Sequence, residues 1–244
     1  KFKKNLWELA NPNNFLNITN MIIPYGVILT IITISIGITW GLFFTPEDYR
    51  QGSAVKIIFI HVPSAFLAIN IYFLMFIASI IWLIRRHHVS LIAAKVAAPI
   101  GFVMTLLAIF TGAVWGKPIW GTYWAWDPRL TSFSILLMFY LGYLSIWQTM
   151  KFNEKTADLS SWLCIIGSIF AVLSRYAVFF WNQGLHQGAS LSLDKEENID
   201  NVFYFPLLFC LAGFVFLFLT LLLFKIRTEI QKRRIITLLN ASDV

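Results

Sequence analysis

Long runs without formal charge divide this chain and restrict its fold more than any other feature. Charged residues make up 13% of the 244 residues, whereas soluble domains carry about 25%. A membrane-spanning helix needs about 20 apolar residues. The uncharged blocks predict six such helices, at 22–44, 58–83, 95–115, 130–150, 160–181 and 203–225. The sequence therefore predicts an all-α polytopic membrane protein, with residues 1–244 as a single membrane domain.

The basic residues predict how this bundle is oriented. Of the 19 Lys and Arg residues, 13 fall in the N-terminal segment, the loops 84–95 and 151–159, and the C-terminal segment. Only five fall in the loops on the other side, and Arg175 lies within a span. Lys and Arg favour cytoplasmic loops, so we expect both termini in the cytoplasm and segment 115–132 on the outer face. The charges flank spans, which gives no indication of nucleic-acid binding.

Segment 115–132, WGKPIWGTYWAWDPRLTS, gathers Trp115, Trp120, Trp124 and Trp126 within twelve positions. Its Gly and Pro residues predict an irregular segment rather than one helix. Tryptophan is common at membrane interfaces, which is the simpler interpretation. However, a belt of this kind places about one aromatic residue at each helix end. The density here favours a surface for a flat apolar ligand such as a porphyrin.

Two histidines fall on the same predicted side as this segment. His61 lies near the outer end of the second span, and His186 lies beyond the outer end of the fifth. Each alone is consistent with an ordinary interfacial residue, but together they could ligate haem iron, for which imidazole is a common axial ligand. His87 and His88 adjoin two arginines in a predicted cytoplasmic loop and favour a solvated basic turn.

Charged groups beside the tryptophans could bind the propionate groups at the polar edge of a haem. Arg129 is the first candidate partner for its propionates, with Lys117, Lys56 and Arg50 on the same side. Asp127 could orient Arg129 or cap the fourth span, since Asp-Pro is typical of a helix start. Arg175 has no assigned role. Cys164 and Cys210 lie within spans and form no C-x-x-C motif, which predicts two buried, inert thiols.

The tryptophan segment resembles the "WWD" signature of haem-handling membrane proteins of cytochrome c maturation. The length, the six spans, the Ile-His-Val-Pro sequence at His61 and the stretch at 181–188 resemble the CcmC family in particular. The resemblance implies haem b as cofactor, held by His61 and His186 as axial ligands. It also implies a haem-binding role for the tryptophan signature of that family, which falls here on Trp115, Trp120, Trp124, Trp126, Asp127 and Arg129.

The same resemblance implies partners and a function. They are the haem chaperone CcmE, the small subunit CcmD, the ABC transporter subunits CcmA and CcmB, and membrane lipid, in a bacterial inner membrane or its mitochondrial counterpart. Its expected function is to present haem at the outer face for covalent loading onto CcmE, as a loading factor rather than a conventional enzyme. Two alternatives stay open: a haem permease, and a docking subunit that binds no cofactor.

Overall fold

The structure, a computed structural model, describes residues 12–180 and 199–242. These residues form a bundle of long helices with no β-strand in the described ranges. The helices are α2 (Pro12–Phe43), α3 (Ile58–Arg85), α4 (His88–Trp120), α5 (Pro128–Thr149), α6 (Glu154–Phe180) and α7 (Asn201–Ser242), and the short 3-10 helix η1 (Ser53–Ile57) precedes α3. Six of these segments are long and apolar enough to cross a membrane. The predicted fold class is therefore confirmed.

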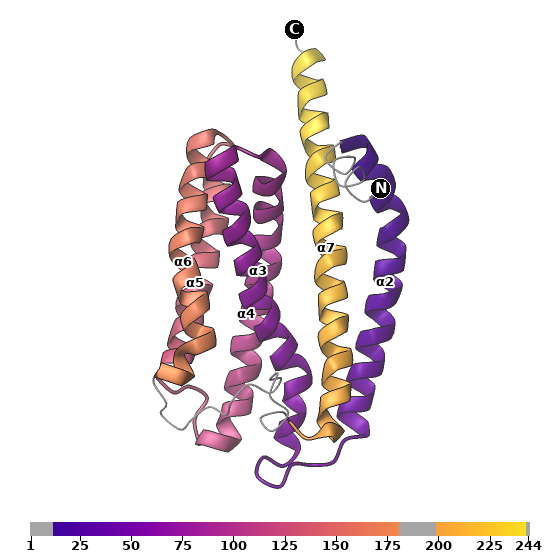
Figure 1. Cartoon of the computed structure of the whole chain (residues 1–244), viewed down its shortest axis with the longest axis vertical. Coiled ribbons are helices and arrows are strands. Elements are labelled where there is room, and N and C mark those ends of the chain that lie inside the picture. The colour runs from indigo at the N-terminus through magenta and orange to yellow at the C-terminus, as the bar shows by residue number, and fades with distance from the viewer. Residues whose placement is uncertain (1–11, 181–198, 243–244) are drawn as a thin grey trace.

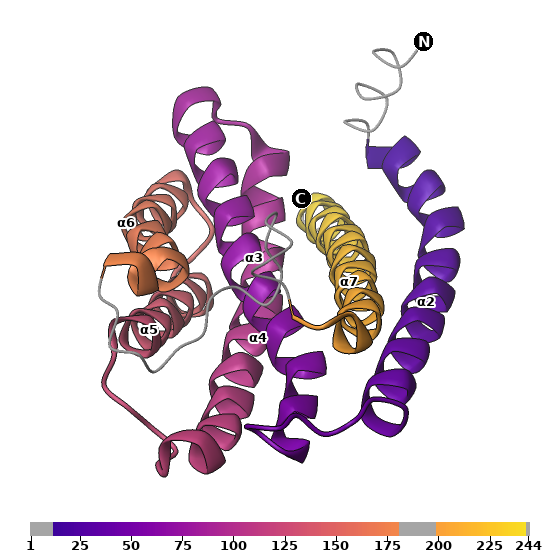
Figure 2. The ribbon, with the colours of Figure 1, turned by 60° about the horizontal axis from the view of Figure 1, so that its bottom comes forward.

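The helices associate as three neighbouring pairs (Figures 1 and 2). α3 and α4 form the central pair, α5 and α6 pack on one side of it, and α7 with α2 packs on the other. α2 contacts mainly α7, and only 6% of its most apolar stretch is buried within the protein, against 56% for α4. α2 thus leaves most of its apolar surface facing outward, as expected for a helix in lipid.

The two ends of the bundle carry different residues (Figure 1). The connection between α4 and α5 lies at one end, together with η1 and the start of α7. We call this the tryptophan end, defined by Trp120, Trp124 and Trp126. The opposite or basic end holds the α3–α4 and α5–α6 connections, the start of α2 and the end of α7. The assignment of the basic end to the cytoplasm stays a prediction.

Two helices extend well past the predicted spans. α2 begins ten residues before position 22, and α7 continues 17 residues past position 225. At 1.5 Å per residue, the 42 residues of α7 measure about 63 Å, roughly twice the thickness of a membrane core. α7 therefore projects beyond the other helices at the basic end (Figure 1).

Close backbone packing joins α2 to α7. A Cβ added at Gly37 would lie 2.7 Å from the backbone nitrogen of Cys210, and one at Gly213 would lie 2.9 Å from that of Ile34. Small residues allow this approach, which is a common means of helix association in lipid.

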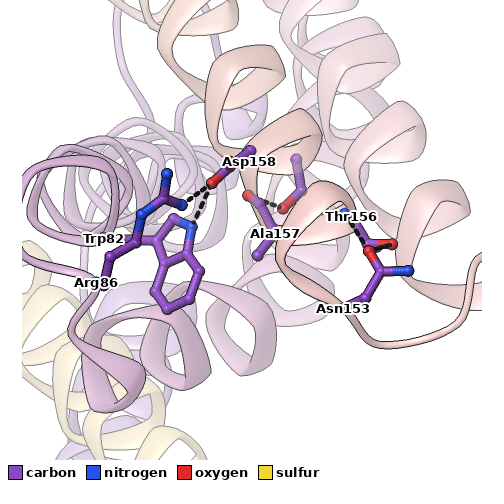
Figure 3. Close-up of polar contacts among 7 residues, drawn as sticks. Trp82, Arg86, Asn153, Thr156, Ala157 and Asp158 are labelled. Atoms are coloured by element: carbon purple, nitrogen blue, oxygen red, sulfur yellow. Dashed lines mark hydrogen bonds and ion pairs between the residues drawn. The ribbon is translucent and has the colours of Figure 1, made fainter.

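A hydrogen-bonded cluster ties α3 to α6 at the basic end (Figure 3). The carboxylate of Asp158 accepts a hydrogen bond from Trp82 Nε1 at 2.9 Å and also pairs with Arg86. Asn153 caps α6 through its side-chain oxygen, which accepts from the Thr156 amide. The two histidines predicted to form a solvated turn also have structural contacts: His87 accepts from the Ser90 amide, and His88 packs on Trp82 with ring centres 5.4 Å apart.

The interior between the two ends is filled by apolar and tyrosine side chains. Tyr72, Met75 and Tyr140 are fully buried there, and the Tyr140 hydroxyl donates to the Ala68 carbonyl at 2.8 Å. Cys164 and Cys210 are both buried as free thiols. The prediction that they are buried, unpaired side chains is confirmed.

Candidate functional site

His61 lies in the first turn of α3, and its ring is oriented by α4. Its Nδ1 is 3.0 Å from the Ala108 carbonyl oxygen and 3.1 Å from the Thr111 hydroxyl. A carbonyl oxygen can only accept, so Nδ1 carries the proton and donates it. In a neutral imidazole the lone pair then resides on Nε2. This is how metal-ligating histidines are commonly oriented, with one ring nitrogen donating to a carbonyl.

Two further residues of α4 shape the space around this ring. A Cβ at position 112 would lie 2.9 Å from His61 Cε1, so Gly112 allows the imidazole to approach the helix closely. The Trp115 indole meets the His61 ring edge to face, with centres 5.5 Å apart, and its Nε1 donates to Gln51 Oε1 at 2.8 Å. His61 and Trp115, both predicted site residues, are thus brought together.

Sequence reasoning missed Gln51, Ala108, Thr111 and Gly112. The last three share one face of α4 with Trp115, at the helical spacing of three and four residues. Positions three, four and seven residues before Trp115 lie on the same face of a helix, and this spacing could have identified the three α4 residues from the sequence.

The structure corrects the prediction for the first part of the tryptophan segment. Gly116 and Pro118 were expected to interrupt the helix, yet α4 continues through both and ends at Trp120, with Gly121 at φ 74°. Gly116 is buried because the Trp120 ring covers it: a Cβ there would lie 2.7 Å from Trp120 Cε3. A single proline this close to a helix end removes only one backbone hydrogen bond. Trp115 and Trp120 are therefore helical residues.

The irregular part of the segment comprises residues 121–127. Trp124 and Trp126 meet there edge to face, with ring centres 5.5 Å apart. The Trp126 side chain is 79% exposed. The Trp124 Nε1 is buried and has no hydrogen-bond partner among the described residues. A buried donor of this kind favours a ligand that brings an acceptor.

Asp127 acts as the cap of α5. Its carboxylate accepts from the Leu130 amide at 2.7 Å, it is only 5% exposed, and Pro128 occupies the first turn. The interpretation of Asp-Pro as a helix start is confirmed. Arg129 is therefore the second residue of α5.

The cations of the tryptophan end fall into two groups. Lys56 donates to the Leu42 carbonyl at 2.7 Å, and Lys117 donates to the Gly121 carbonyl at 2.9 Å. Arg50 lies over the ring of its neighbour Tyr49. These three side chains therefore have partners within the protein.

Arg129 and Arg175 form the second group. Arg129 Nε is buried without a hydrogen-bond partner among the described residues, and the Arg129 charge is repelled by that of Arg175 and attracted, less strongly, by that of Asp127. Neither side chain forms an ion pair with a carboxylate in the described ranges. Arg175 lies in the last turns of α6 and over the ring of its neighbour Tyr176, 5.8 Å from the ring centre, which explains how its charge is tolerated. Two cations near each other favour an anionic ligand group here.

The predicted site residues thus lie in two groups at one end of the bundle. His61, Trp115 and Trp120 belong to the α3–α4 pair, whereas Trp124, Trp126, Asp127 and Arg129 belong to the connection to α5 and its first turn. His186, the predicted second axial ligand, lies outside the described residues. Haem chemistry fits what is described: an oriented imidazole, indole surfaces and cations for carboxylates.

Fold and candidate site together define a polytopic membrane protein with tryptophans gathered at one end of its helical bundle. The chain belongs to the CcmC family, Heme exporter protein C, whose family model matches residues 5–240. It is 57% identical over 230 residues to Heme exporter protein C of Rhodobacter capsulatus, covering 94% of this chain and 95% of that one. The protein of the same name from Paracoccus denitrificans is 56% identical over 234 residues, with 96% and 97% covered. That of Escherichia coli K12 is 37% identical over 234 residues, with 95% and 94% covered.

Proposed function

We propose that this protein binds haem b at its tryptophan end and presents it for covalent loading onto the haem chaperone CcmE during cytochrome c maturation. The observation that carries the proposal is the orientation of His61. Its Nδ1 lies within hydrogen-bond distance of the Ala108 carbonyl, so that Nε2 would be the atom that ligates the iron. The relatives named Heme exporter protein C support haem as the cargo.

Each described residue has a role in this proposal that follows from its surroundings. His61 would ligate the iron, and the family resemblance assigns the opposite axial position to His186. Trp115 holds the His61 ring from one side while Gln51 holds Trp115. Trp124 and Trp126 would contact the porphyrin, and Arg129 with Arg175 would bind its propionates. Asp127 would act by positioning, since it fixes the start of α5.

The protein would work by holding haem in one orientation while CcmE approaches. Bound haem supplies the reactive porphyrin edge to which the chaperone becomes attached. The exposed Trp126 indole lies where an approaching partner could reach it. Orientation and proximity alone can supply several kcal/mol toward a bimolecular step, about 7–11 kcal/mol in the best cases. We therefore describe the protein as a loading factor, with CcmD, CcmA and CcmB as proposed partners.

The packed interior favours loading over passage through the protein. A haem permease needs a polar or histidine-lined route between the two ends. Among the described residues, the space between α3, α4 and α5 is filled by buried side chains such as Tyr72, Met104 and Tyr140. A docking subunit without cofactor would have no need for an imidazole held in one tautomer.

The direct test is the appearance of covalent haem on CcmE. The chain would be expressed in a bacterium that lacks its own CcmC, and CcmE would be examined for haem that survives denaturing electrophoresis. We expect haem-bearing CcmE with the chain and none without it. If CcmE stays free of haem while the chain accumulates in the membrane with CcmD, CcmA and CcmB present, the loading function is wrong.

The arginine pair provides a prediction about affinity. Arg129→Gln combined with Arg175→Gln should weaken haem binding at least about tenfold, since a hydrogen bond to a charged group contributes about 1.5–3 kcal/mol and Arg175 is exposed. Titration of haem into the purified protein, followed by absorption, measures this. Lys56→Gln with Lys117→Gln is the matched control, because it removes two charges from the same end and both lysines already donate to backbone carbonyls. An equal loss in the control would contradict the assignment.

The proposal also requires the tryptophan end to face outward from a bacterial inner membrane. Single cysteines at two exposed positions test this: Tyr123→Cys at the tryptophan end and Met150→Cys at the basic end, which are 58% and 41% exposed. The native cysteines are buried and should react little. A membrane-impermeant maleimide should label position 123 in intact spheroplasts and position 150 only after lysis. The reverse pattern would overturn the orientation.

A further inference from the structure

A groove at the basic end lies far from the tryptophan end and has no part in the proposed function. Its volume is about 580 Å³, in the range of sites that hold small organic ligands. It is formed where the start of α2, the start of α4 and the projecting part of α7 meet. Its apolar walls come from Phe15, Val89, Ile92, Ile226, Ile230 and Leu238.

The rim of this groove is cationic. Arg233 and Arg234 both line it, and no acidic residue among those the structure describes does. The carboxylate of Glu229, on the same helix, is paired with Lys95 at 2.8 Å and with Arg233 at 3.2 Å. The groove therefore offers an excess of positive charge beside an apolar interior.

The two arginines are unequally satisfied. Arg234 donates to the side-chain oxygen of Asn13 at 2.5 Å. Arg233 stacks over Phe152, and its Nη2 is buried without a hydrogen-bond partner among the described residues. A buried cationic donor without an acceptor is costly. An anionic oxygen placed in the groove would supply that acceptor.

The depth of the groove indicates what occupies it. It lies beside the first residues of α2 and α4 and past the charge-free part of α7, where the Lys and Arg residues of that helix begin. This is the level of lipid headgroups and of the first carbons of their chains. Basic pockets between membrane helices commonly bind anionic headgroups.

We propose that this groove is a binding site for an anionic phospholipid, with the phosphate at Arg233 and Arg234 and part of an acyl chain against Ile92, Ile226 and Ile230. The lipid would fill the space between α2, α4 and α7. It would thereby support α2, which contacts the rest of the bundle almost entirely through α7.

The test uses the full chain, purified in detergent and freed of bound lipid. Phosphatidylglycerol or phosphatidylcholine with identical chains is added, and bound lipid is counted by native mass spectrometry. We expect phosphatidylglycerol to bind at lower concentration than phosphatidylcholine. Arg233→Gln with Arg234→Gln should weaken phosphatidylglycerol binding about fivefold per arginine, from about 1 kcal/mol per basic residue near an anionic surface.

Two further variants separate the groove from general surface charge. Lys225→Gln with Lys232→Gln removes the same charge from the same helix at residues that do not line the groove, and should leave binding within about twofold. Val89→Trp keeps every charge but fills the groove from a half-exposed wall position, and should lower binding as much as the arginine pair. Because this variant leaves the ion pairs intact, it tests the site even if the arginine variant fails to fold.

Four results would overturn the proposal. The first two are equal binding of the two lipids and an equal loss in the lysine control. The others are unchanged phosphatidylglycerol binding by Val89→Trp and displacement of the lipid by inorganic phosphate alone. The haem spectrum of each variant should equal that of the wild type, so this test can fail or succeed independently of the proposed function.

Discussion

His61→Ala should abolish tight haem binding by this protein. The variant removes the imidazole whose Nδ1 is held by the Ala108 carbonyl and the Thr111 hydroxyl, and with it the Nε2 atom proposed to ligate the iron. Loss of a residue that merely orients a metal ligand costs about 10–100-fold in affinity, so loss of the ligand itself should cost more than about 100-fold. Titration of haem into the purified variant measures this, with the Soret band reporting any haem that stays bound.

Two further variants, one a control and one a milder change at the same site, are compared with His61→Ala. His88→Ala makes the same substitution at the basic end, where the ring packs on Trp82, and should leave haem affinity unchanged. Thr111→Val removes only one of the two acceptors near Nδ1 and should weaken binding by about tenfold or less. If His61→Ala binds haem as tightly as the wild type, His61 is not a ligand.

The second large effect is expected where α2 meets α7. Gly37→Ala would place a Cβ 2.7 Å from the backbone nitrogen of Cys210 and equally close to its sulfur. A backbone atom cannot rotate away, so one helix must move. Overpacking of this kind costs about 1–3 kcal/mol, and we expect the upper end because α2 has few other contacts. Denaturant unfolding in detergent should show a lower midpoint.

Gly142→Ala is the matched control for this prediction. It makes the same change within α5 and has the same intrinsic helix propensity effect, which favours alanine by about 1 kcal/mol. Its Cβ would meet only the flexible tip of Leu163, at 3.2 Å. The control should be neutral or slightly stabilising. Equal midpoints for the two variants would show that close α2–α7 packing contributes little.

The sequence predicted the number and order of the helices because charge-free blocks report membrane burial directly. It predicted the helix ends less well, because an uncharged run delimits the part of a helix that lies in the membrane and a helix can continue beyond that part. The Lys, Arg, Glu and Gln residues after position 225 are good helix formers, and α7 continues through them to Ser242. In the same way, Pro118 was read as an interruption, although α4 includes it close to its end.

For the candidate site, residue type and predicted side of the membrane select His61, Trp115 and Arg129 as candidates, and their role in binding stays a prediction. The cap at Asp127 was also predictable, because it depends only on local sequence. The partners of His61 were not, because Ala108 and Gly112 reach it only through the register of α4 against α3. The proximity of Arg129 and Arg175 likewise depends on how α5 packs on α6.

The central claim is that one haem binds at the tryptophan end with His61 as an axial ligand. The most direct measurement is the visible absorption and electron paramagnetic resonance of the purified wild-type protein. It would be produced with raised haem supply and without CcmE, so that cargo accumulates. We predict one b-type haem per chain, six-coordinate and low-spin with two imidazole ligands. A folded protein that carries no haem under these conditions would contradict the account.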